Sequence, residues 1–492
     1  MKVLLLSPRG ATVGISLGMG YLASSLKRRG HSVKGLDLNN FRVDNPEILT
    51  REVIENYKPD IVGISVASLT YNTGLDAAKS IKEYYQGPIV FGGIHTFISK
   101  GQILQDNPYI DYALVGEAEE SLPQLVESIN DKGLLSKIRG LIFRNGVDVV
   151  TNEPAEFIME LDELPFPDYK CSGIERIVKY PLLTSRGCPY NCSFCLAPTV
   201  TGKTWRYRSV ENIIQEIKWA SKVYKMDSIQ IMDDNFTLKK NRVMEFCDRY
   251  LQEGLKIPWE CSNGIRADKV DYELAKIMRR AGLFRVNLGV ESLHPDVFGQ
   301  INKGESIEDI RRAVEVLKKV GVSVTGFFII GLPGDTYERT MYSYNEAKKM
   351  GFDKTLFQIL IPFPMTRVYN WVKDNANVFP EYYYSASTWI GNVTFETTDF
   401  LAQERREAYL SLFIKNFRYP YNIEKSKMNQ LLYLLKLVLK YDFKNIHKHL
   451  YKFFVTGINI ILKGSGPTLT GIHFRDVAKV EQHEPLHGST TL

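Results

Sequence analysis

The stretch of sequence that decides the fold runs from Thr184 to Cys195 and reads Thr-Ser-Arg-Gly-Cys-Pro-Tyr-Asn-Cys-Ser-Phe-Cys. Its cysteines, Cys188, Cys192 and Cys195, form a C-x3-C-x2-C arrangement directly after an apolar segment. Three thiolates on one loop can ligate three irons of a four-iron cluster and leave the fourth iron open. Tetrahedral zinc would need a fourth Cys or His nearby, and the flanking sequence offers none. We therefore expect an iron–sulfur cluster.

Apolar strands alternate with amphipathic stretches after the cysteines. A helix is expected at 210–224, and the alternation continues to about residue 370. This pattern predicts a partial (β/α)6 barrel over residues 181–370, whose functional face lies at the carboxyl ends of its strands. The expected strands, beyond the segment at Leu182, are Ser228–Met232, Val286–Val290, Ser323–Ile330 and Leu356–Ile361.

The cysteine motif resembles that of the radical S-adenosylmethionine superfamily, and Phe194 before the last cysteine matches as well. The resemblance implies that the open iron chelates the amino and carboxylate groups of S-adenosylmethionine. One electron from the cluster would then cleave this cofactor to methionine and a 5′-deoxyadenosyl radical, which abstracts hydrogen from substrate. The three cysteines are the expected metal ligands.

Polar residues at the expected strand ends also resemble elements of this superfamily. Acids and amides there can accept hydrogen bonds from an ammonium group or from ribose hydroxyls, although a polar strand end with a helix cap is the alternative. The turns at 331–334 and 361–364 resemble the fifth and sixth strand ends. The expected S-adenosylmethionine contacts are Phe194, Asp233, Asp234, Asn235, Asn263, Arg266, Glu291 and Ser292.

Residues 1–150 alternate strands and helices in a second series, with strands expected at Val3–Leu6, Ile61–Ser65 and Ile89–Phe91. This alternation predicts an α/β domain with a doubly wound, Rossmann-like parallel sheet. The turns at 65–68, 92–95 and 116–119 are rich in small residues, which leave room for a bulky ligand at the carboxyl edge.

This domain, a linker over 151–180 containing Leu-Pro-Phe-Pro, and the cysteine loop resemble the cobalamin-dependent branch of the superfamily. The resemblance implies cobalamin bound at the carboxyl edge. The axial-histidine sequence D-x-H-x-x-G is absent, because Ser-Pro-Arg-Gly follows the first strand, and we interpret His95 as a structural or loop residue. The expected cobalamin contacts are Ser65, Ser68, Gly92, Gly93, Gly116 and Glu117.

The resemblance implies methylation of an unactivated carbon or phosphorus centre through methylcobalamin. A radical cyclase or oxidoreductase with the same cofactors, as in the chlorophyll-pathway ring-forming enzymes, is the alternative. A non-catalytic metal- or cobalamin-binding regulator is an alternative of another class. The tRNA methylthiotransferases need three more cysteines before the barrel, and no cysteine precedes Cys171. The partners expected are a small-molecule, natural-product or lipid substrate and an electron donor such as flavodoxin or ferredoxin.

Three of the six cysteines are clustered in the loop, which indicates metal binding rather than disulfides and therefore a reducing compartment. The chain has 492 residues and 62 basic against 56 acidic side chains, a net charge of +6 that does not indicate nucleic acid. Residues 371–492 are expected to be mainly helical and related to the substrate. Lys and Arg outnumber acids from 415 to 463, and the apolar runs Leu431–Leu439 and Phe453–Leu462 are too short to span a bilayer. We expect a cytoplasmic protein, with peripheral membrane contact as the alternative.

Overall fold

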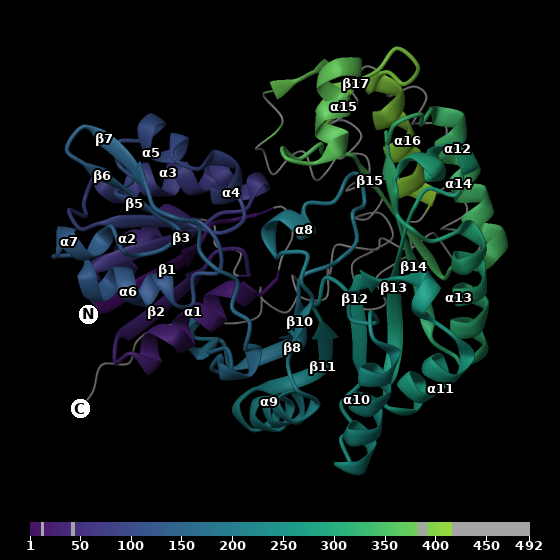
Figure 1. The fold of residues 1–492 in the computed structure, drawn as a ribbon, viewed down its shortest axis with the longest axis horizontal. Coiled ribbons are helices and arrows are strands. Elements are labelled where there is room, and N and C mark those ends of the chain that lie inside the picture. Colours follow the sequence, from purple (N-terminus) through teal and green to yellow (C-terminus); the bar gives the residue numbers. More distant parts are fainter. Residues whose placement is uncertain (11–13, 41–44, 381–382, 384–390, 416–492) are drawn as a thin grey trace.

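The structure, a computed structural model, describes residues 1–10, 14–40, 45–380, 383 and 391–415. Its described part contains two α/β domains that lie side by side, followed by a short C-terminal segment (Figure 1). Of the region 371–492, which was expected to be mainly helical, the structure describes residues 371–380, 383 and 391–415. The runs Leu431–Leu439 and Phe453–Leu462 lie outside the described residues.

The front domain is built on a seven-stranded sheet in the order β2-β1-β3-β4-β5-β6-β7, counted over the described residues. Strands β1 to β5 are parallel, and β6 and β7 are added antiparallel. The order of the parallel strands is a doubly wound arrangement, as predicted. The strands are β1 (Lys2–Ser7), β2 (Ser32–Asp37), β3 (Ile61–Ser65), β4 (Ile89–Gly92), β5 (Tyr112–Leu114), β6 (Leu141–Asn145) and β7 (Asp148–Thr151).

Helices cover both faces of this sheet because its strands are apolar on both sides. In β1, Leu4 and Leu6 face one core while Val3 and Leu5 face the other. The first face is covered by α2 (Pro46–Tyr57), α3 (Tyr71–Lys82) and α5 (Gln102–Asp106), and the second by α1 (Leu17–Arg28), α6 (Ser121–Ser128) and α7 (Lys132–Leu135).

The second domain is a curled sheet of six parallel strands in the order β8-β11-β12-β13-β14-β15. Its helices lie on the outer side, which confirms the expected partial barrel (Figure 1). The strands are β8 (Arg176–Leu182), β11 (Lys225–Ile231), β12 (Trp259–Ile265), β13 (Leu283–Glu291), β14 (Ser323–Ile330) and β15 (Lys354–Ile359). The outer helices are α9 (Val210–Val223), α10 (Lys240–Gln252), α11 (Tyr272–Arg280), α13 (Ile307–Lys319) and α14 (Tyr337–Met350).

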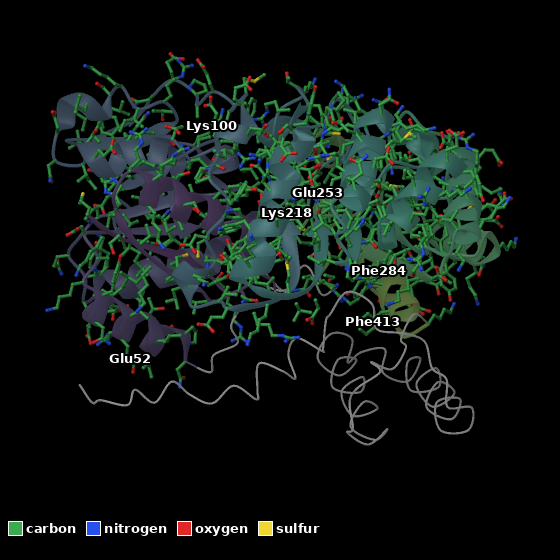
Figure 2. The ribbon with its side chains drawn as sticks, turned by 90° about the horizontal axis from the view of Figure 1, so that it is seen from below. Glu52, Lys100, Lys218, Glu253, Phe284 and Phe413 are labelled. Carbon is green, nitrogen blue, oxygen red and sulfur yellow. The ribbon has the colours of Figure 1, made fainter. Side chains whose placement is uncertain are left out.

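Local signals fix where these helices begin and how they pack. Ser306 and Asp309 form a reciprocal capping box at the start of α13. On the outer surface, Lys218 of α9 forms an ion pair of 2.5 Å with Glu253, the residue that follows α10 (Figure 2). Inside, Trp259 of β12 is fully buried and donates its indole N–H to the Ala281 carbonyl at 2.8 Å. These contacts hold the barrel helices from the polar outer surface and from the apolar core.

The C-terminal segment is attached to the barrel through a buried arginine. Arg405 of α16 (Ala402–Lys415) donates to the carbonyls of Phe400 and Phe395 at 3.0 and 3.2 Å. Its guanidinium lies against the turn after β14, where Gly331 has φ +90 and a Cβ would come within 2.8 Å of it. The short elements α15 (Arg367–Asn375), β16 (Asn377–Val378) and β17 (Phe395–Glu396) lie beside it. Among the described residues, no helix is long and apolar enough to cross a membrane.

Asp335 at this turn gives a testable pH dependence. Burial raises the pKa of Asp335 to about 6, although hydrogen bonds from the Gly331 N–H and the Thr340 hydroxyl favour the ionised form. The stability that this protonated carboxyl contributes is therefore complete below its unfolded pKa and is lost as pH rises through 6.

We expect the unfolding free energy of the wild type to fall, relative to Asp335→Asn, by about 2 kcal/mol between pH 4 and pH 7. Denaturant titrations across this range measure the difference. Asp296→Asn, at an exposed position, is the control and should run parallel to the wild type. Parallel curves for Asp335→Asn would contradict the burial argument.

Candidate active site

The cysteine loop, residues 187–205, is closed at its base by two short antiparallel strands. Gly187 opens the loop with φ +90, and a Cβ there would come within 2.3 Å of the Thr204 carbonyl, so only glycine fits. The Cys188 N–H donates to the Gly202 carbonyl at 3.0 Å. The loop therefore begins and ends at one place. The two strands are β9 (Ser185–Arg186) and β10 (Arg206–Tyr207).

The three loop cysteines are partly buried and unbonded to one another. Burial raises the pKa of the Cys188 and Cys192 thiols and raises that of Cys195 to about 12. Within the described residues, no three His, Cys, Asp or Glu side chains converge on a single ion. In a four-iron cluster each thiolate binds a different iron, so the three loop cysteines are the candidate cluster ligands.

Asp233 and Asp234, which follow β11, are engaged by the base of the loop. The buried Asp233 carboxylate accepts from the Thr184 N–H at 2.6 Å and from the hydroxyls of Thr184 and Ser185. Asp234 accepts from the Gly187 N–H at 3.3 Å and from the Thr201 hydroxyl at 2.7 Å. Both expected cofactor contacts are thus occupied in supporting the cysteine loop.

Asn235 is placed differently, although it is the next residue. Its side chain is buried, and its Nδ2 lies 4.0 Å from the Cys188 sulfur. Its Oδ1 is buried with no hydrogen-bond partner. A buried carbonyl oxygen without a donor is costly, so this atom fits a position where a bound cofactor supplies the donor. Asn263 is exposed and donates to the Met232 carbonyl at 3.2 Å.

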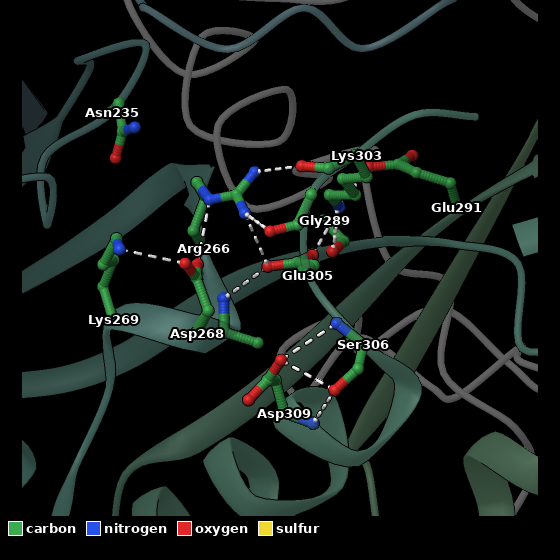
Figure 3. Close-up of polar contacts among 12 residues, drawn as sticks. Asn235, Arg266, Asp268, Lys269, Gly289, Glu291, Lys303, Glu305, Ser306 and Asp309 are labelled. Atoms are coloured by element: carbon green, nitrogen blue, oxygen red, sulfur yellow. Dashed lines mark hydrogen bonds and ion pairs between the residues drawn. The ribbon is translucent and has the colours of Figure 1, made fainter. Parts of the chain in front are cut away.

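Arg266, at the end of β12, holds the far side of the loop. Its guanidinium lies 3.6 Å from the centre of the Tyr190 ring, and it donates to Asp268 at 2.9 Å. It also donates to the carbonyls of Lys303 and Gly304 at 2.6 and 2.9 Å (Figure 3). The expected cofactor contact Arg266 is therefore a bridge between the cysteine loop and the segment that precedes α13.

Glu291 ends β13 and pairs with the buried Lys303 at 2.9 Å (Figure 3). Glu291 has φ +65, an unusual conformation for a residue other than glycine. Burial alone would lower the pKa of Lys303, but the charges of Glu291 and Glu305 outweigh it and raise this pKa. The sequence identified Glu291 as a site residue but not Lys303 or Glu305. The signal that could have found them is a pair of charged residues in a short turn between two helices.

The two remaining residues expected in the barrel site lie in packed surroundings. Ser292 is buried and its hydroxyl lies 3.1 Å from that of Ser343 on α14. Phe194 packs with the apolar cluster that includes Val297 and Leu360. Neither contact involves the cysteine sulfurs.

In the front domain, the turns after β3 and β4 meet at the carboxyl edge. Gly93 has φ +98, and a Cβ there would come within 2.6 Å of the Val66 carbonyl, whereas a Cβ on Gly92 would meet nothing within 4 Å. Ser65 lies beside Gly93, where a Cβ would come within 3.1 Å of its hydroxyl oxygen. This edge therefore has room for a ligand beside Gly92.

His95 lies beneath the same edge. Its Nδ1 is 3.3 Å from the Ser68 hydroxyl, and its ring packs against that of Tyr71, with the ring centres 4.0 Å apart and the planes tilted by 34°. Burial lowers the pKa of His95 to about 4, so the imidazole is neutral at physiological pH. These contacts fit the structural role that the sequence analysis gave to His95.

The loop after β5 contacts the barrel directly. Gly116 has φ +110 and its missing side chain makes room for Ala155. The Glu117 carboxylate accepts one hydrogen bond of 2.8 Å from each terminal nitrogen of the Arg206 guanidinium. It also lies 3.3 Å from the Arg186 guanidinium. Burial would raise the pKa of Glu117, but the hydrogen bonds and charges of these arginines hold it below its usual value. The sequence placed both arginines next to the cysteine loop but did not identify either as a site residue.

Replacing Cys188, Cys192 or Cys195 singly by alanine should abolish the four-iron cluster, because each thiolate holds a separate iron. Iron and sulfide content after anaerobic reconstitution, with electron paramagnetic resonance of the reduced protein, measures this loss. Cys171→Ala, at the partly buried cysteine outside the loop, should retain the cluster. A full cluster in a loop variant would contradict the assignment.

Asn235→Ala should weaken S-adenosylmethionine binding by roughly one to two orders of magnitude, because the side chain can no longer accept a hydrogen bond. Equilibrium binding to the reconstituted protein measures the dissociation constant. The comparison variant is Asn287→Ala, whose amide is engaged by the Ser262 carbonyl at 2.6 Å, and it should bind within about twofold of wild type. Equal affinities for both variants would remove Asn235 from the site.

Comparisons with known proteins agree with this geometry. The Radical SAM superfamily matches residues 182–359, and the B12 binding domain matches residues 7–126. An uncharacterized methyltransferase of Pyrococcus horikoshii is 31% identical over 434 residues, which is 84% of this chain and 93% of that protein. The anaerobic magnesium-protoporphyrin IX monomethyl ester cyclase of Rubrivivax gelatinosus is 26% identical over 90% of this chain and 83% of its own length.

A solved structure has the same arrangement of domains. The cobalamin-dependent S-adenosylmethionine radical enzyme OxsB, with aqua-cobalamin and S-adenosylmethionine bound, superimposes with a TM-score of 0.67 over 93% of this chain and 71% of its own, at 18% identity. That likeness concerns the fold. Together with the family matches and the Pyrococcus relative, it confirms the expected cofactors, a four-iron cluster, S-adenosylmethionine and cobalamin. The chain belongs to the radical S-adenosylmethionine superfamily, in the cobalamin-dependent branch whose members carry a B12-binding domain in front of the barrel.

Proposed function

We propose that this enzyme transfers a methyl group from S-adenosylmethionine, by way of cobalamin, to an unactivated carbon or phosphorus centre of a small molecule. One observation carries the proposal. The loop after β5, at the carboxyl edge of the front domain, is joined to the base of the cysteine loop by the hydrogen bonds between Glu117 and Arg206. The methyltransferase name of the Pyrococcus relative supports this choice.

When bound, the cofactors supply one-electron chemistry and a transferable methyl group. The chain's residues hold and orient them. Cys188, Cys192 and Cys195 would bind the cluster, and Asn235 would accept a hydrogen bond from S-adenosylmethionine beside Cys188. The space beside Gly92, where a Cβ would meet no atom within 4 Å, would leave room for the corrin.

Formation of a ring, or oxidation, is the second candidate function. The Rubrivivax cyclase is similar over 90% of this chain, and both reactions begin with hydrogen abstraction from substrate. They differ in the fate of the methyl group, which enters the product only in methylation.

The substrate class and partners are proposals from the sequence. We propose a natural product or lipid substrate and a flavodoxin- or ferredoxin-type electron donor. The excess of Lys and Arg over 415–463 supports peripheral contact with an anionic lipid surface, although that segment lies outside the described residues. Equal turnover with and without anionic vesicles would remove the lipid proposal.

Label transfer decides between the two functions. Anaerobically reconstituted enzyme, supplied with cobalamin, a reductant and S-adenosylmethionine carrying a trideuteromethyl group, is incubated with small-molecule extracts of the source cells. We expect a product that carries the intact label by mass spectrometry. A product that has lost hydrogen without gaining label would establish the cyclase or oxidase reaction. The Cys192→Ala variant is the control and should yield neither.

A further inference from the structure

Four charged side chains join the two domains at the base of the cysteine loop. Glu117 and Glu119 lie on the loop between β5 and α6, and Arg186 and Arg206 lie on β9 and β10. Arg206 donates two hydrogen bonds of 2.8 Å to the Glu117 carboxylate, and Arg186 forms an ion pair with Glu119 at 2.5 Å. We call these four residues the interdomain clamp.

The clamp is built into the interior rather than placed on the surface. The Arg206 side chain is 1% exposed, and those of the other three are at most 10% exposed. Arg206 also donates to the carbonyls of Ile158 and Thr201, at 2.6 and 2.8 Å. Buried ion pairs contribute little net stability, but a bidentate arginine–carboxylate contact fixes both the distance between the two groups and their relative orientation.

The two arginines connect the clamp to the cysteine loop. Arg186 and Arg206 lie directly opposite each other in the β9–β10 pair, so they border the cysteine loop on both sides. Cys188 lies two residues beyond Arg186. A displacement of the front-domain carboxylates would therefore be transmitted to both ends of the loop that carries the cysteines.

We propose that the interdomain clamp sets the position of the cysteine loop relative to the B12-binding domain, and so the approach of S-adenosylmethionine to the corrin. Its members are positioning residues that act through the loop. Glu117 thereby has a role other than the cobalamin contact expected from the sequence, since Arg206, Arg186 and the Ile158 N–H already engage its carboxylate. This inference rests on the proposed methyl transfer.

Two half-reactions separate positioning from cofactor binding. Methyl transfer from S-adenosylmethionine to the reduced corrin leaves S-adenosylhomocysteine and needs both domains. One-electron cleavage of S-adenosylmethionine gives methionine and, after the adenosyl fragment takes a hydrogen atom from buffer components, 5′-deoxyadenosine, and it needs the barrel alone. Titanium(III) citrate supplies the electrons for both.

The test variants are Glu117→Gln and Glu119→Gln, which keep side-chain shape and remove charge. The matched control is Glu120→Gln, on the same loop, whose exposed carboxylate pairs with Arg28 and Arg29 within the front domain. We expect the clamp variants to retain iron and corrin content while S-adenosylhomocysteine formation falls by roughly tenfold to a hundredfold. 5′-Deoxyadenosine formation should stay within about twofold of wild type, and the control should match wild type in both.

A second readout needs no cofactor. Hydrogen exchange of the cofactor-free chain should rise by about tenfold in peptides covering 185–188 and 206–208 of Glu117→Gln, with no change in Glu120→Gln. The exchanged pair Glu117→Arg with Arg206→Glu should restore part of the protection that Arg206→Glu alone removes.

Three results would overturn the clamp. Loss of corrin from Glu117→Gln would make Glu117 a cofactor contact. An equal fall in both half-reactions would make the role merely structural, and wild-type rates of both half-reactions in the clamp variants would leave no role. Failure of the proposed function appears elsewhere. In that case, wild-type enzyme loaded with corrin would itself form no S-adenosylhomocysteine.

Discussion

The buried carboxylate of Asp233 is the contact on which the barrel end of the site depends. It accepts a backbone N–H and two hydroxyls from Thr184 and Ser185, and so ties the end of β8 to the end of β11. Burial raises the pKa of Asp233, and these donors together with the charge of Arg242 favour its ionised form. The cysteine loop begins two residues after Ser185, so this carboxylate fixes where the loop leaves the barrel.

The rest of the loop is held by contacts that reach across the whole sheet. Asp234 joins its two ends, and Arg266 covers Tyr190 near its middle. The Ser193 N–H donates to the Ile301 carbonyl, and the Ser193 carbonyl accepts from the Val368 N–H, each at 2.9 Å. The loop thus contacts segments after β11, β12, β13 and β15. A cluster site made of a surface loop is in this way as well supported as a site on a strand.

The sequence predicted those parts of the structure that have local signals. The apolar run Ile61–Ser65 coincides with β3, and the cysteine spacing identified the loop. The edge strand β2 was missed because Lys34 and Gly35 interrupt its apolar residues, and the short β5 because it has only three residues. The antiparallel pairing of β6 and β7 was not predicted either, because the pattern of apolar residues along a strand does not show whether the strand pairs parallel or antiparallel.

In the site, residue types were predicted better than contacts. Asp233, Asp234 and Arg266 lie around the cysteine loop as expected, but which partner each carboxylate or guanidinium chooses depends on residues distant in the chain. The pairing of Glu117 with Arg206 spans 89 positions. Nothing near either residue in the sequence indicates the other, and the contact exists only because two separately folded sheets meet.

That separation in sequence has a consequence during synthesis. The front domain ends at about β7, well before Arg186 and Arg206 are made, and domains generally fold as units in the order in which they leave the ribosome. Glu117 and Glu119 are therefore hydrated while the barrel is being translated. They lose that water only when the arginines arrive, so docking of the two domains is a late event. A chain truncated before residue 186 lacks both arginines and keeps two like charges at the surface that receives the barrel.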